Sequence, residues 1–366
     1  MITVNREQFD EAAKSVASIA KKGAISPAAE AAFLSSSEDG VFSIKGTDMA
    51  NWLSLSIPGD GGSIEPIQVD AFKLADIVSK LTGETVKIEA KDGYLHLASN
   101  KSKRKIAGMA TTYPVSPPVE GITSTINVAD LRAAIDFAKP IVDVQHNMPM
   151  IRGVRLADDH AIGTNGGGFC AARCDGVGEP ITLTIDTIKL LKSVTSSDEA
   201  ELTHDGRRVS IRWDGGEIAS SLIEGDWGFL RAGGVSGFIK DHDAHLTCHP
   251  AELMRAVTAV NALAASDSAT RTSRVALSLS REGCAVVPKS SVGEGEEPFD
   301  AEWDGEDMTI NILHNNLDRA FKGFDANADV VIGITALPES GNEGAKGCTI
   351  RQPSQAGLVA MVSQVR

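Results

Sequence analysis

Apolar residues recur with helical spacing in three segments that begin one third of the chain apart. The segments are NREQFDEAAKSVASIAKK from Asn5, NVADLRAAIDFAKPIV from Asn127 and HPAELMRAVTAVNALAA from His249. In each, apolar positions follow the i, i+3, i+4, i+7 pattern of an amphipathic helix, with a polar or proline-containing cap and an acidic residue in the first turn. The starts are 122 residues apart, one third of the 366-residue length. This spacing predicts a threefold internal repeat.

A second helical pattern follows in each third, and alternating strand-like stretches follow each helix. The six predicted helices span residues 6–22, 70–81, 127–142, 186–195, 249–265 and 313–323. Strands that alternate apolar and polar residues around Asp-Gly or a similar pair predict β-hairpins. The predicted hairpin turns are Asp39-Gly40, Asp92-Gly93, Asp158-Asp159, Asp205-Gly206 and Glu282-Gly283.

The repeating order of helix, strands, helix and strands predicts an α+β fold with helices on one face of antiparallel sheet. The period divides the chain into three similar domains of 1–121, 122–243 and 244–366. Pro-rich Tyr113–Thr125 and Gly-rich Gly228–His245 fall where linkers between these domains are expected.

The composition is that of an ordinary globular protein, with 42% hydrophobic and 23% charged residues. The N-terminus has early charges and no apolar core, which argues against a signal peptide, and no apolar run approaches the roughly 18 residues of a membrane span. Five scattered cysteines indicate reduced thiols in a cytoplasmic protein. Cys170 and Cys174 lie in a predicted strand at even spacing, where we expect both to pack on one face.

The formal charge of −14 argues against nucleic acid until its distribution is considered. The six predicted helices carry thirteen basic and ten acidic residues, whereas the remaining residues carry 22 basic and 39 acidic ones. Slightly basic helices and strongly acidic strands suit a protein whose helices face DNA and whose other surfaces repel it. Many of these cations also lie near helix C-termini, where the helix dipole favours them without any DNA, and composition alone does not separate the two interpretations.

No zinc-finger spacing or aromatic RNA-binding motif occurs, so any DNA contact is expected to be with the backbone and independent of sequence. The candidate DNA-facing cations are Lys14, Lys21, Lys22, Lys73, Lys80, Arg132, Lys139, Lys189, Lys192, Arg255, Arg319 and Lys322.

With the threefold repeat established, the whole chain resembles the bacterial DNA sliding clamp, the β subunit of DNA polymerase III. Four stretches carry the resemblance in order and spacing: TDMANWLSLSIP from Thr47, the helix, hairpin and basic strand of Val69–Gly108, MPMIRGVRL with GTNGGGFCAA within Met148–Ala172, and SLIEGDW from Ser221. The resemblance implies a head-to-tail homodimer of three-domain chains that closes a ring around duplex DNA. Its role would be processivity: a polymerase tethered to the ring stays on the template.

The resemblance implies no catalytic residue, metal or cofactor, because a separate ATP-driven loader opens the ring. It also implies a dimer contact between a strand near Ile106 and a helix near Leu263. Polymerase and loader would bind through linear peptides in a pocket between the second and third domains. The matching pocket positions are Ile151, Thr164, Gly166, Phe169, Val235, Met361, Val362 and Ser363.

The pocket departs from the family pattern at three places, one of which is the absence of a proline expected near Val235. Asn165-Gly166-Gly167-Gly168 replaces the family's Asp-Gly-His-Arg, and Met361-Val362-Ser363-Gln364 replaces Met-Pro-Met-Arg. We therefore predict a pocket in the same place with altered peptide preference. An alternative is a clamp-fold adaptor, or a secondary clamp of phage or plasmid type, with its own partner.

Three other features have competing interpretations. The Gly-rich GTNGGGF (Gly163–Phe169) lacks the Lys-Ser/Thr ending of a phosphate loop and is better explained as a turn that needs positive φ. His242, His245 and His249 with Cys248 suggest a metal site, but exposed linker histidines explain them better. KSKRK (Lys101–Lys105) is either a DNA contact or a charged edge strand, and we favour the edge strand. An enzyme with a site assembled from scattered residues is a further alternative, which the evenly repeated pattern disfavours.

Overall fold

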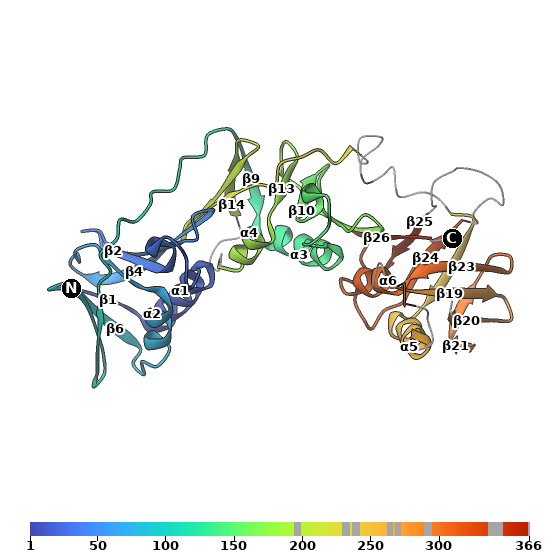
Figure 1. The fold of residues 1–366 in the computed structure, drawn as a ribbon, viewed down its shortest axis with the longest axis horizontal. Coiled ribbons are helices and arrows are strands. Elements are labelled where there is room, and N and C mark those ends of the chain that lie inside the picture. Colours follow the sequence, from blue (N-terminus) through green and yellow to red (C-terminus); the bar gives the residue numbers. More distant parts are fainter. Residues whose placement is uncertain are drawn as a thin grey trace. The chain divides into compact units, whose positions relative to one another are not determined.

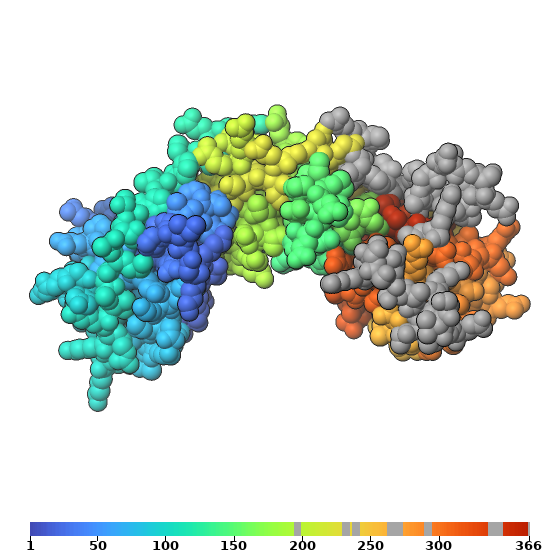
Figure 2. Space-filling model, in the orientation of Figure 1, coloured from blue at the N-terminus to red at the C-terminus, as the bar shows by residue number. Residues whose placement is uncertain are grey.

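The computed structural model describes residues 1–193, 199–228, 235, 242–261, 266–267, 272–288, 295–335 and 347–364. These residues form two compact units. Unit 1 comprises residues 1–129, 176–179 and 183–222, and unit 2 comprises residues 130–175, 180–182 and 223–366. In Figures 1 and 2, unit 1 is the blue-to-teal first third of the chain together with a yellow-green part of the middle third.

Unit 1 is built on a 12-stranded sheet with three helices. The main path of the sheet runs β8-β7-β6-β1-β4-β16-β15-β14-β9, with β3 also on β4, β2 on β3 and β5 on β2. The helices are α1 (Arg6–Ile19), α2 (Ala71–Val78) and α4 (Ile185–Leu190). The strands are β1 (Ile2–Asn5), β2 (Ala31–Ser36), β3 (Val41–Thr47), β4 (Asn51–Gly61), β5 (Ile67–Asp70), β6 (Thr85–Lys91), β7 (Tyr94–Ser99), β8 (Ser102–Ala107), β9 (Ile122–Asn127), β14 (Glu199–His204), β15 (Arg208–Trp213) and β16 (Gly216–Ser221).

Unit 2 holds a nine-stranded sheet, ordered β13-β10-β11-β12-β26-β25-β24-β17-β22, and a five-stranded one of β18, β19, β20, β21 and β23. Its helices are α3 (Val128–Ala138), α5 (Pro250–Asn261) and α6 (His314–Phe321). The strands are β10 (Val154–Ala157), β11 (His160–Thr164), β12 (Gly168–Arg173), β13 (Ile181–Leu183), β17 (Ala244–Cys248), β18 (Ser266–Asp267), β19 (Thr272–Ser280), β20 (Gly283–Pro288), β21 (Glu297–Phe299), β22 (Ala301–Trp303), β23 (Met308–Leu313), β24 (Val330–Ile334), β25 (Gly347–Arg351) and β26 (Leu358–Ser363).

All six predicted helices are confirmed, and five of them are shorter than predicted. Side-chain caps fix several starts: Asn5 accepts from two amides of α1, Asp70 accepts from the Lys73 amide, and Thr184 accepts from the Thr187 amide. Helices α3 and α4 end in 3₁₀ turns at residues 139–141 and 191–193, which accounts for part of the shortening. Residues 194–195 and 262–265 of two predicted helices lie outside the described residues.

All five predicted hairpin turns lie between paired strands. Asp92 and Gly93 have φ of 51° and 74°, and Asp158 and Asp159 have φ of 51° and 56°. Two consecutive residues with positive φ match the twist of the flanking strands, which is why Asp-Gly and Asp-Asp pairs stand there.

Helices pack on one face of the sheet in unit 1. The buried face of α1 includes Phe9 and Val16, and the Phe9 ring meets the Phe42 ring edge-on with centroids 5.4 Å apart. On strands β3 and β4, Ile44 and Leu53 point into this core, so Lys45 and Ser54, which follow them along the strands, point to the opposite face. The predicted α+β class, with helices on one face of antiparallel sheet, is confirmed.

Each long sheet is continuous across a junction between predicted domains. Strand β4 pairs with β16 from Leu55↔Gly216 to Asn51↔Ser220, and β12 pairs with β26 from Gly168↔Val362 to Ala172↔Leu358. The division into three domains, with boundaries at residues 121 and 243, stays a prediction. No helix among the described residues is long and apolar enough to cross a membrane.

Candidate functional site

The predicted DNA-facing cations are largely at the surface, and seven of the twelve form ion pairs. Lys14, Lys73, Lys80, Lys189 and Lys322 pair with an aspartate three or four residues earlier at N···O distances of 2.7–3.6 Å. Lys21 pairs with Asp48 at 2.8 Å, and that hydrogen bond and charge raise the Lys21 pKa. Arg255 pairs with Glu252 at 3.2 Å and also with Glu297.

The other five cations are not alike. Lys22 and Lys192 are exposed, whereas Lys139 and Arg319 are half-buried, as is Arg132, which has a partner of its own. The carboxylates beside the paired lysines would compete with DNA phosphates, but exposed pairs of this kind contribute only about 0.2–1 kcal/mol and are readily exchanged. The local pairing also explains the lysines without DNA, so both interpretations of the helix charges stay open.

Four predicted pocket residues lie together in unit 2. Ile151, Phe169 and Val235 are buried in one apolar cluster, and Met361 packs against it. Strands β12 and β26 bring Phe169 and Met361 directly opposite each other. The cluster lies on one face of the junction of these strands, because residues 169 and 361 share the same side of the pleat.

The remaining pocket positions surround the turn before β12. Thr164 donates to the Gly168 carbonyl at 2.7 Å and accepts from the Gly166 amide at 3.1 Å. The Ser363 amide donates to the Gly167 carbonyl at 2.9 Å. Val362 is fully buried and, as the strand neighbour of Met361, points to the opposite face from the cluster.

Trp227 and Arg155 complete the cluster and were not singled out from the sequence. The Trp227 ring is 1% exposed, its Nε1 donates to the Met150 carbonyl at 2.8 Å, and the Arg155 guanidinium lies 5.7 Å from the ring centroid. Burial lowers the pKa of Arg155, although the charge of Asp158 opposes this. The only sequence signal was the tryptophan at the end of SLIEGDW, immediately before the Gly-rich linker.

Asn316 of α6 is the other residue that sequence reasoning missed. It is buried, its Oδ1 accepts from Asn165 Nδ2 at 2.8 Å, and its Nδ2 donates to the Gly167 carbonyl at 3.1 Å. The positive φ predicted for the Gly-rich turn is confirmed at Gly166, where φ is 81°. Gly167 and Gly168 serve close approach instead: a Cβ there would lie 2.7 Å from Asn316 Nδ2 and from the Met361 carbonyl, respectively.

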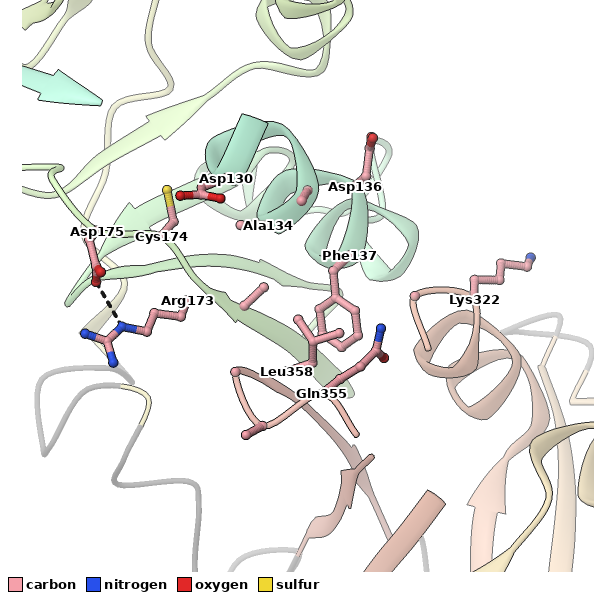
Figure 3. Close-up of a pocket in the computed structure, with 15 residues that line it drawn as sticks. Asp130, Ala134, Asp136, Phe137, Arg173, Cys174, Asp175, Lys322, Gln355 and Leu358 are labelled. Atoms are coloured by element: carbon pink, nitrogen blue, oxygen red, sulfur yellow. Dashed lines mark hydrogen bonds and ion pairs between the residues drawn. The ribbon is translucent and has the colours of Figure 1, made fainter. Parts of the chain in front are cut away.

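A separate groove of about 690 Å³ lies on unit 2 beside α3, the end of β12 and the turn before β26 (Figure 3). The Arg173–Asp175 ion pair, at 3.0 Å, lies at one end and Lys322 at the other. Burial raises the pKa of the Cys174 thiol to about 11, so this thiol is protonated at neutral pH and is a poor nucleophile. No predicted pocket residue lines this groove.

Of the two residues predicted at the dimer contact, Ile106 lies among the described residues, and the contact itself stays a prediction. Ile106 lies on β8, which is the terminal strand of the 12-stranded sheet, but its side chain is buried within unit 1. Strand β8 is an edge strand with Lys103, Arg104 and Lys105 exposed, which fits the edge-strand interpretation of KSKRK, and its role stays a prediction. Leu263 lies outside the described residues.

The expectation of exposed linker histidines is wrong in part. His242 is half-buried and its ring nitrogens contact the hydroxyls of Thr335 at 3.1 Å and Thr349 at 2.7 Å, because strands β24 and β25 lie beside it. His245 is exposed but belongs to strand β17, where it pairs with Asp304 at 3.3 Å. Within the part of the chain that the structure describes, no group of three potential metal ligands occurs.

The expected packing role of Cys170 and Cys174 is confirmed, since both are buried. Burial raises the Cys170 pKa to about 12, which fits an unreactive thiol in the core.

The whole chain is similar in fold to solved bacterial sliding clamps. It superposes on the DNA polymerase III β subunit of Thermotoga maritima with a TM-score of 0.83 and 17% identity, covering 100% of both chains. The Bacillus subtilis sliding clamp gives 0.81 and 19%, and the Pseudomonas aeruginosa sliding clamp bound to griselimycin gives 0.84 and 16%, each over 100% of this chain and 98% of the other. No family model and no curated protein matches the sequence. The chain therefore has the sliding-clamp fold in a divergent sequence.

Proposed function

We propose that this protein is a DNA sliding clamp, a non-catalytic processivity subunit that encircles duplex DNA and tethers a polymerase. The observation that carries the proposal is the match of fold over the entire chain, with TM-scores of 0.81–0.84 to β subunits of DNA polymerase III. In this proposal the domains 1–121, 122–243 and 244–366 form half of a ring, which a second copy closes head to tail.

The surface of the helices supports backbone contact with DNA. The predicted cations that are exposed stand on helices α1, α2, α4, α5 and α6 or the turns that follow them, while the strands and loops carry most of the acidic excess. Contact between lysines and phosphates requires no recognition of bases, as a mobile ring needs. The affinity of such contacts falls steeply as the salt concentration rises.

The apolar cluster of unit 2 is the proposed site for polymerase and loader peptides. Met361 and Met150 are the partly buried members of this cluster, and methionine side chains adapt readily to different apolar partners. Because Phe169 and Trp227 already fill the interior, a peptide would dock against Met361 and Met150 at its surface. Phe169→Ala and Met361→Ala are expected to weaken binding of a polymerase tail peptide, and unchanged affinity would contradict this assignment.

The decisive experiment is retention on circular DNA. The labelled protein is loaded onto a nicked plasmid with the clamp loader of the same organism, and the plasmid is then cut once. A ring that encircles DNA stays on the circle in moderate salt and leaves from the ends after cutting, whereas electrostatic binding is indifferent to cutting. Equal loss before and after cutting would contradict encirclement.

Charge reversal tests the helix surface. Reversing Lys14, Lys73 and Lys189 to glutamate is expected to reduce loading and its salt dependence without unfolding, because each lost phosphate contact lowers the salt slope by about 0.9. A matched control reverses Lys87, Lys91 and Arg281, which are exposed on β6 and the β19–β20 turn. Equal effects of both triple variants would refute a helix-lined DNA surface.

The second candidate is an adaptor with the same fold and a private partner. In this alternative the turn in which Gly167 and Gly168 replace the family's His and Arg would serve the private partner, but the match of fold over the whole chain does not favour it. Failure to be retained on closed circles at every salt concentration, with the loader present, would support the adaptor.

A further inference from the structure

A cavity of about 750 Å³ lies in unit 1, on the face of the sheet opposite the helices. Its floor is a row of cross-strand neighbours on one face: Gln68 on β5, Phe33 on β2, Lys45 on β3, Ser54 on β4 and Glu217 on β16. Its roof is the linker of residues 111–119, which leads from the end of β8 towards β9 (Figure 1). The volume is that of a small-molecule site.

The walls of this cavity are aromatic. Tyr113 of the linker stacks on Phe33 with ring centroids 5.2 Å apart and an interplanar angle of 23°. Trp52, two residues before Ser54 on the same face of β4, adds a third ring, and Val115 and Pro117 add apolar surface. Flat apolar walls of this kind favour a planar ligand.

Three polar atoms of the lining are buried without a hydrogen-bond partner in the described structure: Trp52 Nε1, Gln68 Oε1 and Tyr113 Oη. Leaving a buried donor or acceptor unpaired costs about 1–3 kcal/mol, and all three residues line the cavity, so a ligand towards which these side chains turn would recover that energy. Burial raises the pKa of Tyr113, so its hydroxyl is protonated at neutral pH and can donate. The cavity thus offers two donors and one acceptor.

The charges of the lining favour an anion at one place. Arg212 is paired with Glu217 at 3.3 Å and with Glu201 at 3.6 Å. Lys45 forms no recorded ion pair with any described residue, although it stands in the middle of the floor between Phe33 and Ser54. Its ammonium group is therefore the cation available to a ligand.

The same construction in unit 2 is closed by its own side chain. Arg155 stands 122 residues after Phe33, one repeat later, and so corresponds to it. Trp227, just before the second linker, corresponds to Tyr113 in the first linker. There the linker ring lies over Arg155 and its Nε1 is bonded to the Met150 carbonyl. In unit 1 the linker ring is equally docked, on Phe33, but its hydroxyl is unpaired and the ring lines an open cavity.

We propose that this cavity binds a planar aromatic acid. The anionic group of the ligand lies at Lys45, and its acceptors take hydrogen bonds from Trp52 Nε1 and Tyr113 Oη. An N–H group of the ligand donates to Gln68 Oε1. The site is independent of the proposed clamp function, because it uses neither the helix cations nor the apolar cluster of unit 2.

The test uses 6-anilinonaphthalene-2-sulfonate, a fluorescent aromatic anion with one N–H, titrated into the full-length protein at neutral pH. Saturable binding is expected at one site per chain, with energy transfer from Trp52. Lys45→Met and Trp52→Phe are each expected to weaken binding about tenfold, as for a lost hydrogen bond to a charged group. Lys91→Met and Trp303→Phe are matched controls and are expected to change nothing.

The N–H is tested with 6-phenoxynaphthalene-2-sulfonate, in which an ether oxygen replaces it, as a competitor. This compound is expected to compete less well than the anilino compound, and Gln68→Leu is expected to remove the difference. Absence of saturable binding, or binding that Lys45→Met and Trp52→Phe leave unchanged, would overturn the proposal. Displacement of the probe by a short apolar peptide but not by free aromatic acids would also overturn it, in favour of a peptide site.

Discussion

Replacing Asn316 tests whether α6 holds the Gly-rich turn of unit 2. Asn316→Ala removes two hydrogen bonds, from Asn165 Nδ2 at 2.8 Å and to the Gly167 carbonyl at 3.1 Å. The Gly167 carbonyl keeps the Ser363 amide as a donor, so only Asn165 Nδ2 loses its partner. At about 0.5–1.5 kcal/mol for each bond, the free energy of unfolding is expected to fall by about 1–2 kcal/mol.

The assay is urea unfolding of unit 2 followed by tryptophan fluorescence. In a Trp52→Phe, Trp213→Phe background the remaining tryptophans, Trp227 and Trp303, both lie in unit 2. With a slope of about 2 kcal/mol/M, the midpoint is expected to fall by about 0.5–1 M.

The matched control is Asn315→Ala, the preceding residue, which has no recorded side-chain bond and is expected to shift the free energy by less than about 0.5 kcal/mol. Combining Asn165→Ala with Asn316→Ala isolates their bond as a coupling of about 1 kcal/mol. Equal effects of Asn315→Ala and Asn316→Ala, or a coupling below about 0.3 kcal/mol, would refute the assigned role.

Three further predictions concern buried groups. Trp227→Ala is expected to destabilise unit 2 by about 3–5 kcal/mol, measured by urea unfolding followed by circular dichroism. Burial lowers the pKa of His204 below 6.5, so the unfolded chain binds a proton there that the folded chain does not. The free energy of unfolding, measured from pH 7.5 to 5.5, is therefore expected to fall below pH 6.5, by at most about 1.4 kcal/mol per pH unit. In His204→Leu this fall is expected to be smaller. Gly168→Ala puts a Cβ 2.7 Å from the Met361 carbonyl and is expected to cost about 1–3 kcal/mol in thermal unfolding, whereas Gly283→Ala, with no atom within 4 Å, is expected to be neutral.

Local structure was readable from the sequence because its causes are local. The i, i+3, i+4 pattern of α1 and its Asn5 cap lie within a few residues of each other, and so do the turn residues Asp92 and Gly93. Helix ends were overestimated because 3₁₀ turns such as residues 139–141 keep apolar residues buried after the α-helix has ended.

The candidate sites depend on partners far apart in the chain, which a pattern does not specify. The sequence could not show that Trp227 bonds to the Met150 carbonyl 77 residues away, or that Asn316 reaches Gly167. A count of helix cations also does not reveal that a lysine such as Lys14 is paired with an aspartate of the same helix. The contact between Asn316 and Gly167 depends on strand pairing between two thirds of the chain, because β12 pairs with β26 beside it.

The turn that precedes the junction strand is built twice with different residues. Thr47 donates to a carbonyl four residues later at 2.7 Å and accepts from an amide two residues later at 2.9 Å, and Thr164 does the same at 2.7 and 3.1 Å. Two residues after the threonine stands Met49 in the first turn and Gly166 in the second, with φ of 76° and 81°, respectively. A methionine in this region costs about 1 kcal/mol, so the turn is not fixed by glycine preference.

What fixes it is contact with neighbouring elements. Asp48 of the first turn is bonded to Lys21, and Asn165 of the second is bonded to Asn316. Different side chains thus secure one backbone geometry at the two junctions, where β4 meets β16 and β12 meets β26. A fold whose junctions are specified by backbone pairing, with interchangeable side-chain contacts, can keep its geometry while its sequence diverges. The combination of 16–19% identity with TM-scores above 0.8 is the expected consequence.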